Sequence, residues 1–178
     1  MSATSSVEFN GQVVVISGAA TGIGKSSAQL IAARGAKIIA LDFNKGALDE
    51  LAKELNLAAN QLHICDISDQ AQITATVSAI LKDHGQIDAL INTAGIVGPS
   101  NTQFEDVNWP DFEKVLQVNL YGAIWLTQAV IPSMKAKKYG RIVHLASIAG
   151  KEGNPGLSPY NTSKAGMIGF VKGVAKEV

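Results

Sequence analysis

The chain has 178 residues, of which 47% are hydrophobic and 17% charged, and this composition fits one soluble globular domain with a sizeable core. Its 15 basic and 15 acidic residues cancel, so the charge pattern does not favour a nucleic acid or an anionic membrane as a partner. The start, MSATSSVEFNG, lacks the segments of a signal peptide, and no apolar run approaches the ~18 residues of a spanning helix. A single cysteine, Cys65, rules out an internal disulfide, so we expect a reducing compartment, either the cytoplasm or an organelle matrix.

Short β-rich runs alternate with longer helical stretches along the chain. The predicted strands are 13–17 (VVVIS), 37–42 (KIIALD), 62–66 (LHICD), 87–92 (IDALIN) and 141–147 (RIVHLAS). The predicted helices run from a glycine loop to Arg34, over about 45–56, from Ser68 to just before Gly85, from Asn108 to about Pro132, and from Ser158 onward. Ser68 and Ser158 are candidate N-caps. Continuous apolar strands between helices predict an α/β fold, a doubly wound, Rossmann-like parallel sheet with helices on both faces, in a single domain over residues 1–178.

The segment SGAATGIGKS (17–26) lies between the first strand and the first helix. Gly18, Gly22 and Gly24 would let the backbone turn tightly and approach a pyrophosphate closely. The helix that follows would present unpaired N–H groups and a positive dipole end to that anion. A glycine-rich tight turn without a ligand is the plain alternative, but the position between strand and helix favours dinucleotide binding.

Asp42 ends the second predicted strand, 18 residues after Gly24. A carboxylate there can accept hydrogen bonds from the adenosine ribose 2′-hydroxyl and would repel a 2′-phosphate, so NAD is favoured over NADP. Two observations weigh against a firm choice. Asp42 could instead cap the next helix, and Lys25 is a cation that could soften the preference.

Several motifs occur together in a fixed order. They are SGAATGIG at 17–24, CDI at 65–67, NTAG at 92–95, VNL at 118–120, LASIAG at 145–150 and YNTSK at 160–164. With these motifs the chain resembles the short-chain dehydrogenase/reductase family, in its smaller single-domain form, from about Gly11 to Val178. Only NTAG departs visibly, with Thr93 where alanine is common.

The resemblance implies a cofactor site and a catalytic group. The residues expected to bind the cofactor are Gly18, Thr21, Gly22, Ile23, Gly24, Asp42, Asp66, Ile67, Asn92, Ala94, Gly95, Tyr160 and Lys164. Asp66 and Ile67 would lie along the adenine. The expected catalytic residues are Asn119, Ser147, Tyr160 and Lys164. No metal site is expected, since His63, His84 and His144 show neither ligand spacing nor a carboxylate companion and are interpreted as structural or solvent-exposed.

The chemistry of YNTSK can be argued from its residues. Hydride transfer between a carbinol carbon and a nicotinamide requires a proton to leave or join the oxygen. A free tyrosine has a pKa of about 10, and bringing it to ~7 would need roughly 4 kcal/mol of preferential phenolate stabilisation. The spacing i, i+4 places Tyr160 and Lys164 on one helix face, where the ammonium favours the phenolate and can also hold the nicotinamide ribose.

Two more side chains would complete the site. Ser147 would donate to the substrate oxygen, and Asn119 would hold a water that links Lys164 to solvent. As alternatives, Ser147 could be a strand-end cap and Asn119 a structural helix residue.

The expected activity is therefore NAD-dependent oxidation of a secondary alcohol or reduction of a ketone, on a sugar or polyol or on a 3-oxoacyl compound. The loop 150–158 should line the substrate side. Family members usually form dimers or tetramers, so a homo-oligomer is expected.

The end of the chain leaves other readings open. The sequence stops at VAKEV within a helical pattern, after five strands where the complete sheet has at least six. The fifth strand would then be an unpaired edge, and we expect a truncated chain. A nucleotide-binding fragment without turnover is the alternative function, and a sugar-nucleotide epimerase fits the glycine spacing less well.

Overall fold

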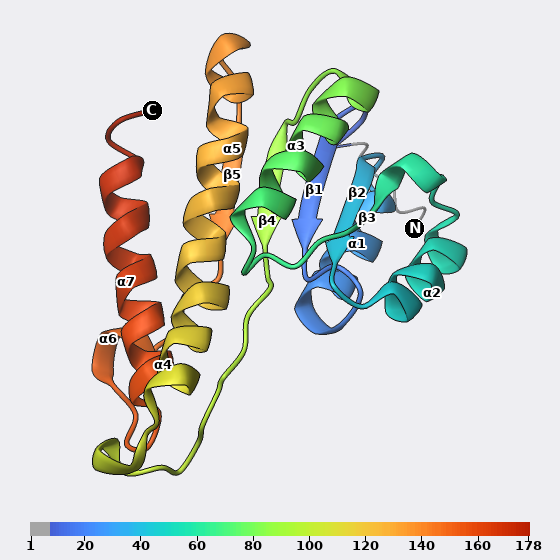
Figure 1. Ribbon diagram of the computed structural model, residues 1–178. Helices are drawn as coiled ribbons and strands as arrows, with labels where there is room; N and C mark the ends of the chain where they lie inside the picture. Colours follow the sequence, from blue (N-terminus) through green and yellow to red (C-terminus); the bar gives the residue numbers. More distant parts are fainter. Residues whose placement is uncertain (1–7) are drawn as a thin grey trace, which may run out of the picture.

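The computed structural model describes residues 8–178 (Figure 1). The prediction that the chain starts without a signal peptide rests in part on the first seven residues, which lie outside this range. The strands are β1 (Val13–Ser17), β2 (Lys37–Asp42), β3 (Leu62–Ile64), β4 (Ala89–Asn92) and β5 (Arg141–His144). The α-helices are α1 (Gly22–Ala32), α2 (Lys45–Leu55), α3 (Gln70–His84), α4 (Trp109–Leu116), α5 (Gly122–Ala136), α6 (Ala149–Glu152) and α7 (Ser158–Val174). Within residues 8–178 no helix combines the length and apolar character needed to cross a membrane.

The five strands form one parallel sheet in the order β3-β2-β1-β4-β5. The chain winds outward from β1 in one direction and then, through β4, in the other, so the strand order reverses between β1 and β4. In open α/β sheets a ligand crevice forms at such a switch point, outside the carboxyl ends of the strands. The predicted α/β fold with a doubly wound parallel sheet is confirmed.

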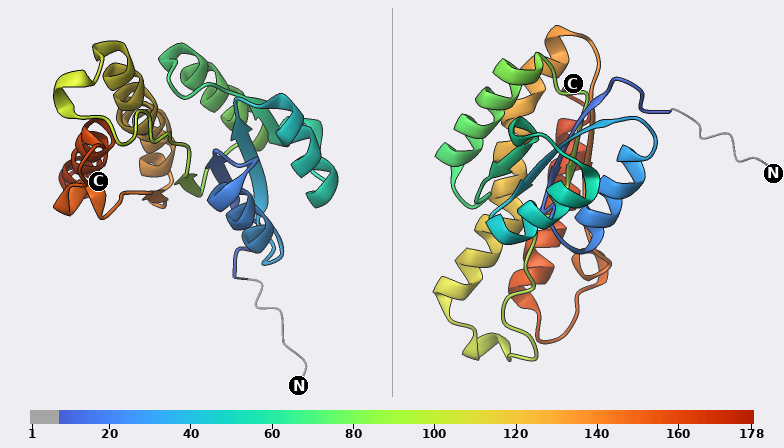
Figure 2. Two further views of the ribbon diagram at one scale, coloured as in Figure 1. Left: turned by 90° about the horizontal axis from the view of Figure 1, so that it is seen from below. Right: turned by 90° about the vertical axis from the view of Figure 1, so that its right-hand side faces the viewer.

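Helices cover both faces of the sheet, and β1 shows why (Figure 2). Val13 and Val15 pack with residues of α3 and α5 on one face, whereas Val14 and Ile16 pack with residues of α1 and α2 on the other. All five residues of β1 are buried, so alternate side chains enter two separate apolar cores. The α7 helix lies at the β5 end of the molecule, in contact with α4 and α6.

Two strands end earlier than predicted. β3 ends at Ile64 rather than at residue 66, and β5 ends at His144 rather than at residue 147. Each of them stops where its neighbour stops, since Ile64 pairs with Asp42 and His144 with Asn92. Beyond these pairs a single backbone bond continues each ladder, so the following residues are free to form the loops of the crevice.

Both predicted serine caps are wrong. Asp69 caps α3 by accepting hydrogen bonds from the backbone of Ala71 and Gln72, while the Ser68 hydroxyl donates to Asp66. The α7 helix begins at Ser158 itself, and the hydroxyl oxygen of Ser158 is buried without a hydrogen-bond partner in the described chain.

The long helix predicted after Asn108 is interrupted. Between α4 and α5 the residues Gln117–Tyr121 form one π-helical turn, with Asn119 buried inside it. Such turns are rare and occur frequently at functional sites. This one places the Asn119 side chain toward the loop that follows β4.

Candidate active site

The predicted site residues lie at or just after the carboxyl ends of the five strands, in the first turn of α1, in the first two turns of α7 and in the π-helical turn between α4 and α5. These segments are far apart in the sequence, and the strand order brings them to one edge of the sheet (Figure 1). The site is described first on its glycine-loop side and then on its tyrosine side.

The glycine loop is shaped to admit an anion at the start of α1. Gly22 has φ of +52°, and a methyl group on it would meet no atom within 4 Å, so its face is open. Gly24 is buried, and a methyl group there would overlap the carbonyl oxygen of Gly18. The N-cap residue Thr21 makes no side-chain cap, and the first turn of α1 holds no acidic residue. The free N–H groups of this turn and the open face of Gly22 fit a pyrophosphate.

Asp42 is 7% exposed and holds two backbone segments of the crevice. Its Oδ2 accepts from the amide of Ala20 at 3.1 Å, and its Oδ1 accepts from the amide of Asn44 at 3.0 Å. Asn44, not Asp42, caps α2. A carboxylate oxygen can accept two hydrogen bonds, so the Asp42 carboxylate retains capacity for ribose hydroxyls.

Lys25, which could have weakened the effect of Asp42, is engaged elsewhere. Its Nζ is 2.6 Å from Oε2 of Glu54, and both side chains are partly exposed. The hydrogen bonds from Lys25 and Gln29, with the Lys25 charge, lower the pKa of the Glu54 carboxyl. The ammonium is therefore paired with a carboxylate of α2.

Asp66 and Ile67 follow β3 on the side expected to meet the adenine. Asp66 is exposed and accepts from the backbone and hydroxyl of Ser68. Ile67 is 6% exposed and packs in the core below. Its carbonyl oxygen would lie 2.5 Å from a methyl group placed on Gly122, so α5 approaches it very closely.

The motif NTAG (92–95) connects the glycine loop to the rest of the site. Asn92 is 3% exposed, and its side-chain oxygen accepts from the hydroxyl of Ser17. Thr93, the departure from the common motif, donates its hydroxyl to the carbonyl of Ser17 at 2.7 Å, with the carbonyl of Gly18 at 3.3 Å. The extra hydroxyl of Thr93 thus connects the residue that follows β4 to the start of the glycine loop.

Lys164 is the central cation of the tyrosine side. It is 6% exposed, and its Nζ donates to the carbonyl of Leu145 at 2.7 Å and lies 5.5 Å from the centre of the Tyr160 ring. Burial lowers the pKa of the Lys164 ammonium. A methyl group on Gly95 would be 3.8 Å from this Nζ, so the cation faces the NTAG loop as well.

Asn119 joins that loop to α7. Its Oδ1 accepts from the amide of Ile96, and its Nδ2 donates to the carbonyl of Ile96, both at 2.8 Å. Nδ2 also donates to the hydroxyl of Ser163 at 3.1 Å, and Ser163 donates to the carbonyl of Tyr160 at 2.7 Å. Both amide hydrogens of Asn119 are therefore used, which favours the structural alternative for its side chain over the water relay.

Ser147 lies in the loop after β5. Its hydroxyl oxygen accepts from the amide of Ala149, the first residue of the short α6, at 3.2 Å. The hydroxyl hydrogen remains available to a substrate oxygen. Among residues 8–178 no hydrogen bond joins Ser147 to Tyr160. Gly150 lets α6 touch α7, because a methyl group there would overlap the backbone of Lys164.

The structure adds residues that the sequence interpretation missed. Ser163 links Asn119 to Tyr160, and Ser17, Thr127 and His144 form a polar group with Asn92. Ser163 and Ser17 lie inside motifs that had been recognised, so their position was a usable signal. Thr127 and His144 carried no such signal. Cys65 is buried, and burial raises the pKa of its thiol.

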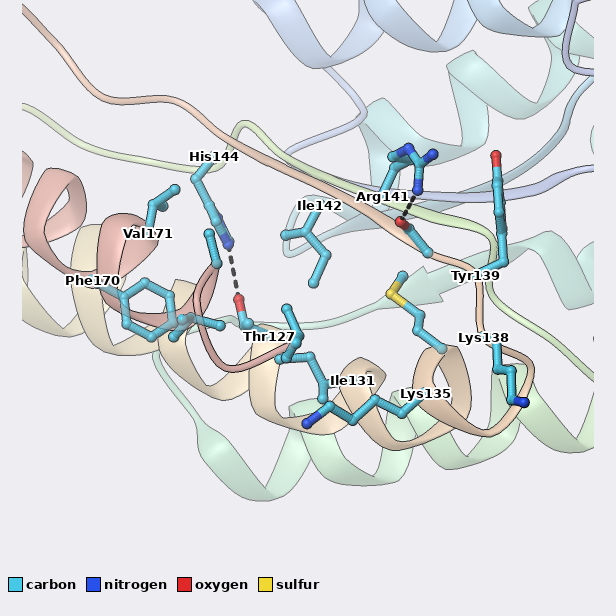
Figure 3. Close-up of a pocket in the computed structure, with 15 residues that line it drawn as sticks. Thr127, Ile131, Lys135, Lys138, Tyr139, Arg141, Ile142, His144, Phe170 and Val171 are labelled. Carbon is cyan, nitrogen blue, oxygen red and sulfur yellow. Dashed lines mark hydrogen bonds between the residues drawn. The ribbon is translucent and has the colours of Figure 1, made fainter.

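A groove lies beside this site. It has a volume of about 680 Å³ and is lined by α5, β5 and α7, including Ile131, Ile142, His144 and Phe170 (Figure 3). None of the four residues predicted to be catalytic lines it. It is therefore distinct from the crevice at the strand ends.

Comparisons with known proteins find relatives that match most of this chain. A sequence profile of the family described as short chain dehydrogenase matches residues 12–178. Similar relatives include a 3-oxoacyl-[acyl-carrier-protein] reductase FabG of Thermotoga maritima, 38% identical over 97% of this chain and 70% of the relative. A 2-dehydro-3-deoxy-L-rhamnonate dehydrogenase (NAD(+)) of a Sphingomonas species is 38% identical over 96% of this chain and 67% of its own length.

Solved structures show the same similarity. The NAD+-bound structure of a xylitol dehydrogenase has a TM-score of 0.87 and 32% identity, covering 96% of this chain and 66% of that one. A levodione reductase has a TM-score of 0.89 and 32% identity, covering 95% and 67%. The chain thus spans about two thirds of the length of the proteins that it matches.

Proposed function

The chain belongs to the short-chain dehydrogenase family, and on this premise we propose that it is an NAD(H)-dependent oxidoreductase that interconverts a secondary alcohol and a ketone. The observation that supports this proposal is the placement of the Lys164 ammonium over the Tyr160 ring, at the edge of the sheet that carries the open glycine loop. A phenol, a buried cation and an anion-binding turn at one switch point are the parts that this reaction needs.

Tyr160 is proposed to move the proton of the substrate oxygen. The Lys164 ammonium, 5.5 Å from the centre of the Tyr160 ring, would stabilise the negative charge that develops on the tyrosine oxygen during the proton transfer. In alcohol oxidation the phenolate accepts the hydroxyl proton, and in ketone reduction the phenol returns it. A bound nicotinamide dinucleotide, held by the glycine loop, Asp42 and Lys164, would supply the hydride acceptor or donor.

Ser147 and Asn119 take supporting roles. The free hydroxyl hydrogen of Ser147 would donate to the substrate oxygen and orient it toward Tyr160. Asn119 holds the loop at Ile96 and, through Ser163, the first turn of α7. We therefore assign Asn119 a positioning role, in place of the water relay expected from the resemblance.

The preference for NAD over NADP is part of the proposal. It rests on the carboxylate of Asp42 at the end of β2 and on the pairing of Lys25 with Glu54. The substrate class follows the names of the relatives, which are a sugar-acid dehydrogenase, a xylitol dehydrogenase and a 3-oxoacyl reductase. A sugar, a polyol or a 3-oxoacyl compound is therefore proposed, and the homo-oligomer remains a prediction.

The test measures the absorbance of the reduced cofactor with a panel of polyols, sugar acids and 3-oxoacyl thioesters. The wild type should turn over at least one of them, and Tyr160→Phe should abolish turnover while NAD binding is largely retained. Tyr139→Phe is the matched control, because Tyr139 stands near Arg141 at the opposite end of β5 and its ring stacking survives the change. Full activity in Tyr160→Phe would remove Tyr160 from its role.

A second outcome is kept distinct from the first. If the wild type binds NAD but turns over no member of the panel, the result favours the alternative function, a nucleotide-binding protein without catalytic turnover. Calorimetric titration with NAD and NADP separates this case from a failure to bind any dinucleotide.

A further inference from the structure

A continuous chain of hydrogen bonds runs beneath the site from β1 to α5. The hydroxyl of Ser17 lies against the side-chain oxygen of Asn92, and the Asn92 amide nitrogen is 3.3 Å from Nδ1 of His144. Nε2 of His144 is 2.8 Å from the hydroxyl of Thr127 (Figure 3). This hydroxyl lies 2.7 Å from the carbonyl oxygen of Ala123. Four side chains from four different elements are thus joined in series.

The direction of this chain follows from its two ends. A carbonyl oxygen only accepts, so Thr127 donates its one hydroxyl hydrogen to Ala123 and must accept from Nε2 of His144. A neutral imidazole with its hydrogen on Nε2 accepts at Nδ1, so Asn92 turns its amide nitrogen toward that atom. Its oxygen then accepts from Ser17. The reverse order would leave the Ser17 hydrogen with no acceptor among the contacts of residues 8–178.

The chain spans the two halves of the site. On one side Asn92 is bound to Ser17, at the end of the strand that leads into the glycine loop. On the other side His144 precedes Leu145, whose carbonyl holds the Lys164 ammonium and whose amide lies 3.4 Å from the carbonyl of Asn92. A shift of His144 would therefore be felt both at the cofactor side and at the cation.

We propose that His144, as the neutral tautomer with its hydrogen on Nε2, is a positioning residue that fixes Asn92 on the cofactor side and Leu145 on the Lys164 side. Its meaning for catalysis rests on the proposed function, whereas the hydrogen-bond chain itself does not.

The surroundings of His144 favour the neutral ring. A second ring hydrogen would point from Nδ1 at the amide hydrogens of Asn92, and the chain would break at that contact. The charged group that acts on His144 from the neighbouring elements is Lys164 of α7, which is also positive. Phe170 packs its apolar ring edge-on against the imidazole, at 6.1 Å between ring centres.

The first measurement determines the tautomer directly. Imidazole nitrogen chemical shifts of protein with 15N-labelled histidine, assigned with His144→Phe, should show hydrogen on Nε2 of His144 at neutral pH. Thr127→Val removes the acceptor of that hydrogen and should shift the population toward the Nδ1–H form. Thr74→Val is the matched control, because Thr74 makes the same bond to the carbonyl four residues earlier, on the remote helix α3.

The second measurement asks whether Asn92 is held by this ring. Hydrogen exchange of the Asn92 side-chain amide and the Kd for NAD are compared in His144→Phe and His144→Asn. The asparagine places an oxygen near the position of Nδ1 and can still accept from Asn92, whereas phenylalanine cannot. We expect the Phe variant to exchange faster and bind NAD about fivefold more weakly, as for one neutral hydrogen bond, and the Asn variant to recover most of both.

The outcomes separate the two proposals. An Nδ1–H ring in the wild type, or equal behaviour of the Phe and Asn variants, overturns the positioning role whatever the activity. If the wild type neither binds NAD nor turns over a substrate, the proposed function fails, while the tautomer and the Asn92 exchange still decide the role of His144. If the two variants lose the same amount of Tm, and the Asn92 exchange rate and the Kd for NAD recover only in the Asn variant, the result supports positioning over simple packing.

Discussion

Acidification should destabilise this protein through His144. The imidazole is partly buried between β5, α5 and α7, and burial together with the positive charge of Lys164 lowers its pKa from 6.5 to about 4. In the unfolded chain the same ring takes up a proton near pH 6.5. Between these two values the unfolded state binds one more proton than the folded state.

The sign and size of the effect follow from linkage. Where the unfolded state binds more protons, the free energy of unfolding falls as the pH falls. The contribution of His144 is complete above pH 6.5 and is lost as the pH drops through the folded value near 4. At ~1.36 kcal/mol per pKa unit, about 2 kcal/mol is lost by pH 5 and about 3 kcal/mol by pH 4.

Urea unfolding at a series of pH values between 7 and 4 measures this loss. Other groups titrate in the same range, so the quantity of interest is the difference in free energy of unfolding between the wild type and His144→Asn. The variant retains an acceptor for Asn92 but no titrating ring, and the other groups cancel in the difference. From pH 7 to pH 4 the free energy of unfolding of the wild type, relative to that of the variant, should fall by about 3 kcal/mol.

A difference that stays constant from pH 7 to pH 4 would refute the reasoning. It would mean that His144 titrates alike in the folded and unfolded states, and so that neither burial nor Lys164 acts on it as the structure indicates. A difference that grows as the pH falls would mean that the folded protein prefers the charged ring.

The remaining predictions concern the cofactor side. Asp42→Ala should lower the ratio of kcat/KM with NAD to kcat/KM with NADP, because the carboxylate that would repel a 2′-phosphate is removed. An unchanged ratio would show that this carboxylate does not contact the ribose. Thr93→Val should lower the free energy of unfolding by about 1 kcal/mol in urea through the lost bond to Ser17, and a change no larger than in Thr74→Val would contradict this. Gly24→Ala should lower the free energy of unfolding by about 1–3 kcal/mol and weaken NAD binding, because the added methyl group would overlap the backbone of Gly18. Gly169→Ala, where the methyl group enters open space on α7, should leave the free energy of unfolding unchanged or raise it by up to about 1 kcal/mol in the same assay.

Local sequence chemistry was sufficient for the α/β class and for the parts of the site that lie within one motif. The strand VVVIS, the glycines at 18, 22 and 24 and the carboxylate of Asp42 could be placed because apolar periodicity and turn chemistry act over a few residues. The contact of Lys164 with the Tyr160 ring follows from the same reasoning, since both lie on one face of α7.

Interactions between distant segments could not be predicted in this way. Ser68 and Asp69 are both good N-cap residues, and only the structure shows that Asp69 caps α3. β5 ends at His144 because β4 ends at Asn92, which no property of the segment 141–147 reveals. The hydrogen bonds of Asn119 with Ile96 and Ser163 likewise depend on the π-helical turn that holds its side chain.

The sequence by itself determined the order of strands and helices, the glycine-rich turn before α1, and a tyrosine and a lysine one helical turn apart, because each of these depends on near neighbours. Only the tertiary structure decided that His144 belongs with Ser17, Asn92 and Thr127. The physical reason is the strand order, which places β4 between β1 and β5 and lays α5 across them. Residues separated by dozens of positions thereby come within hydrogen-bonding distance.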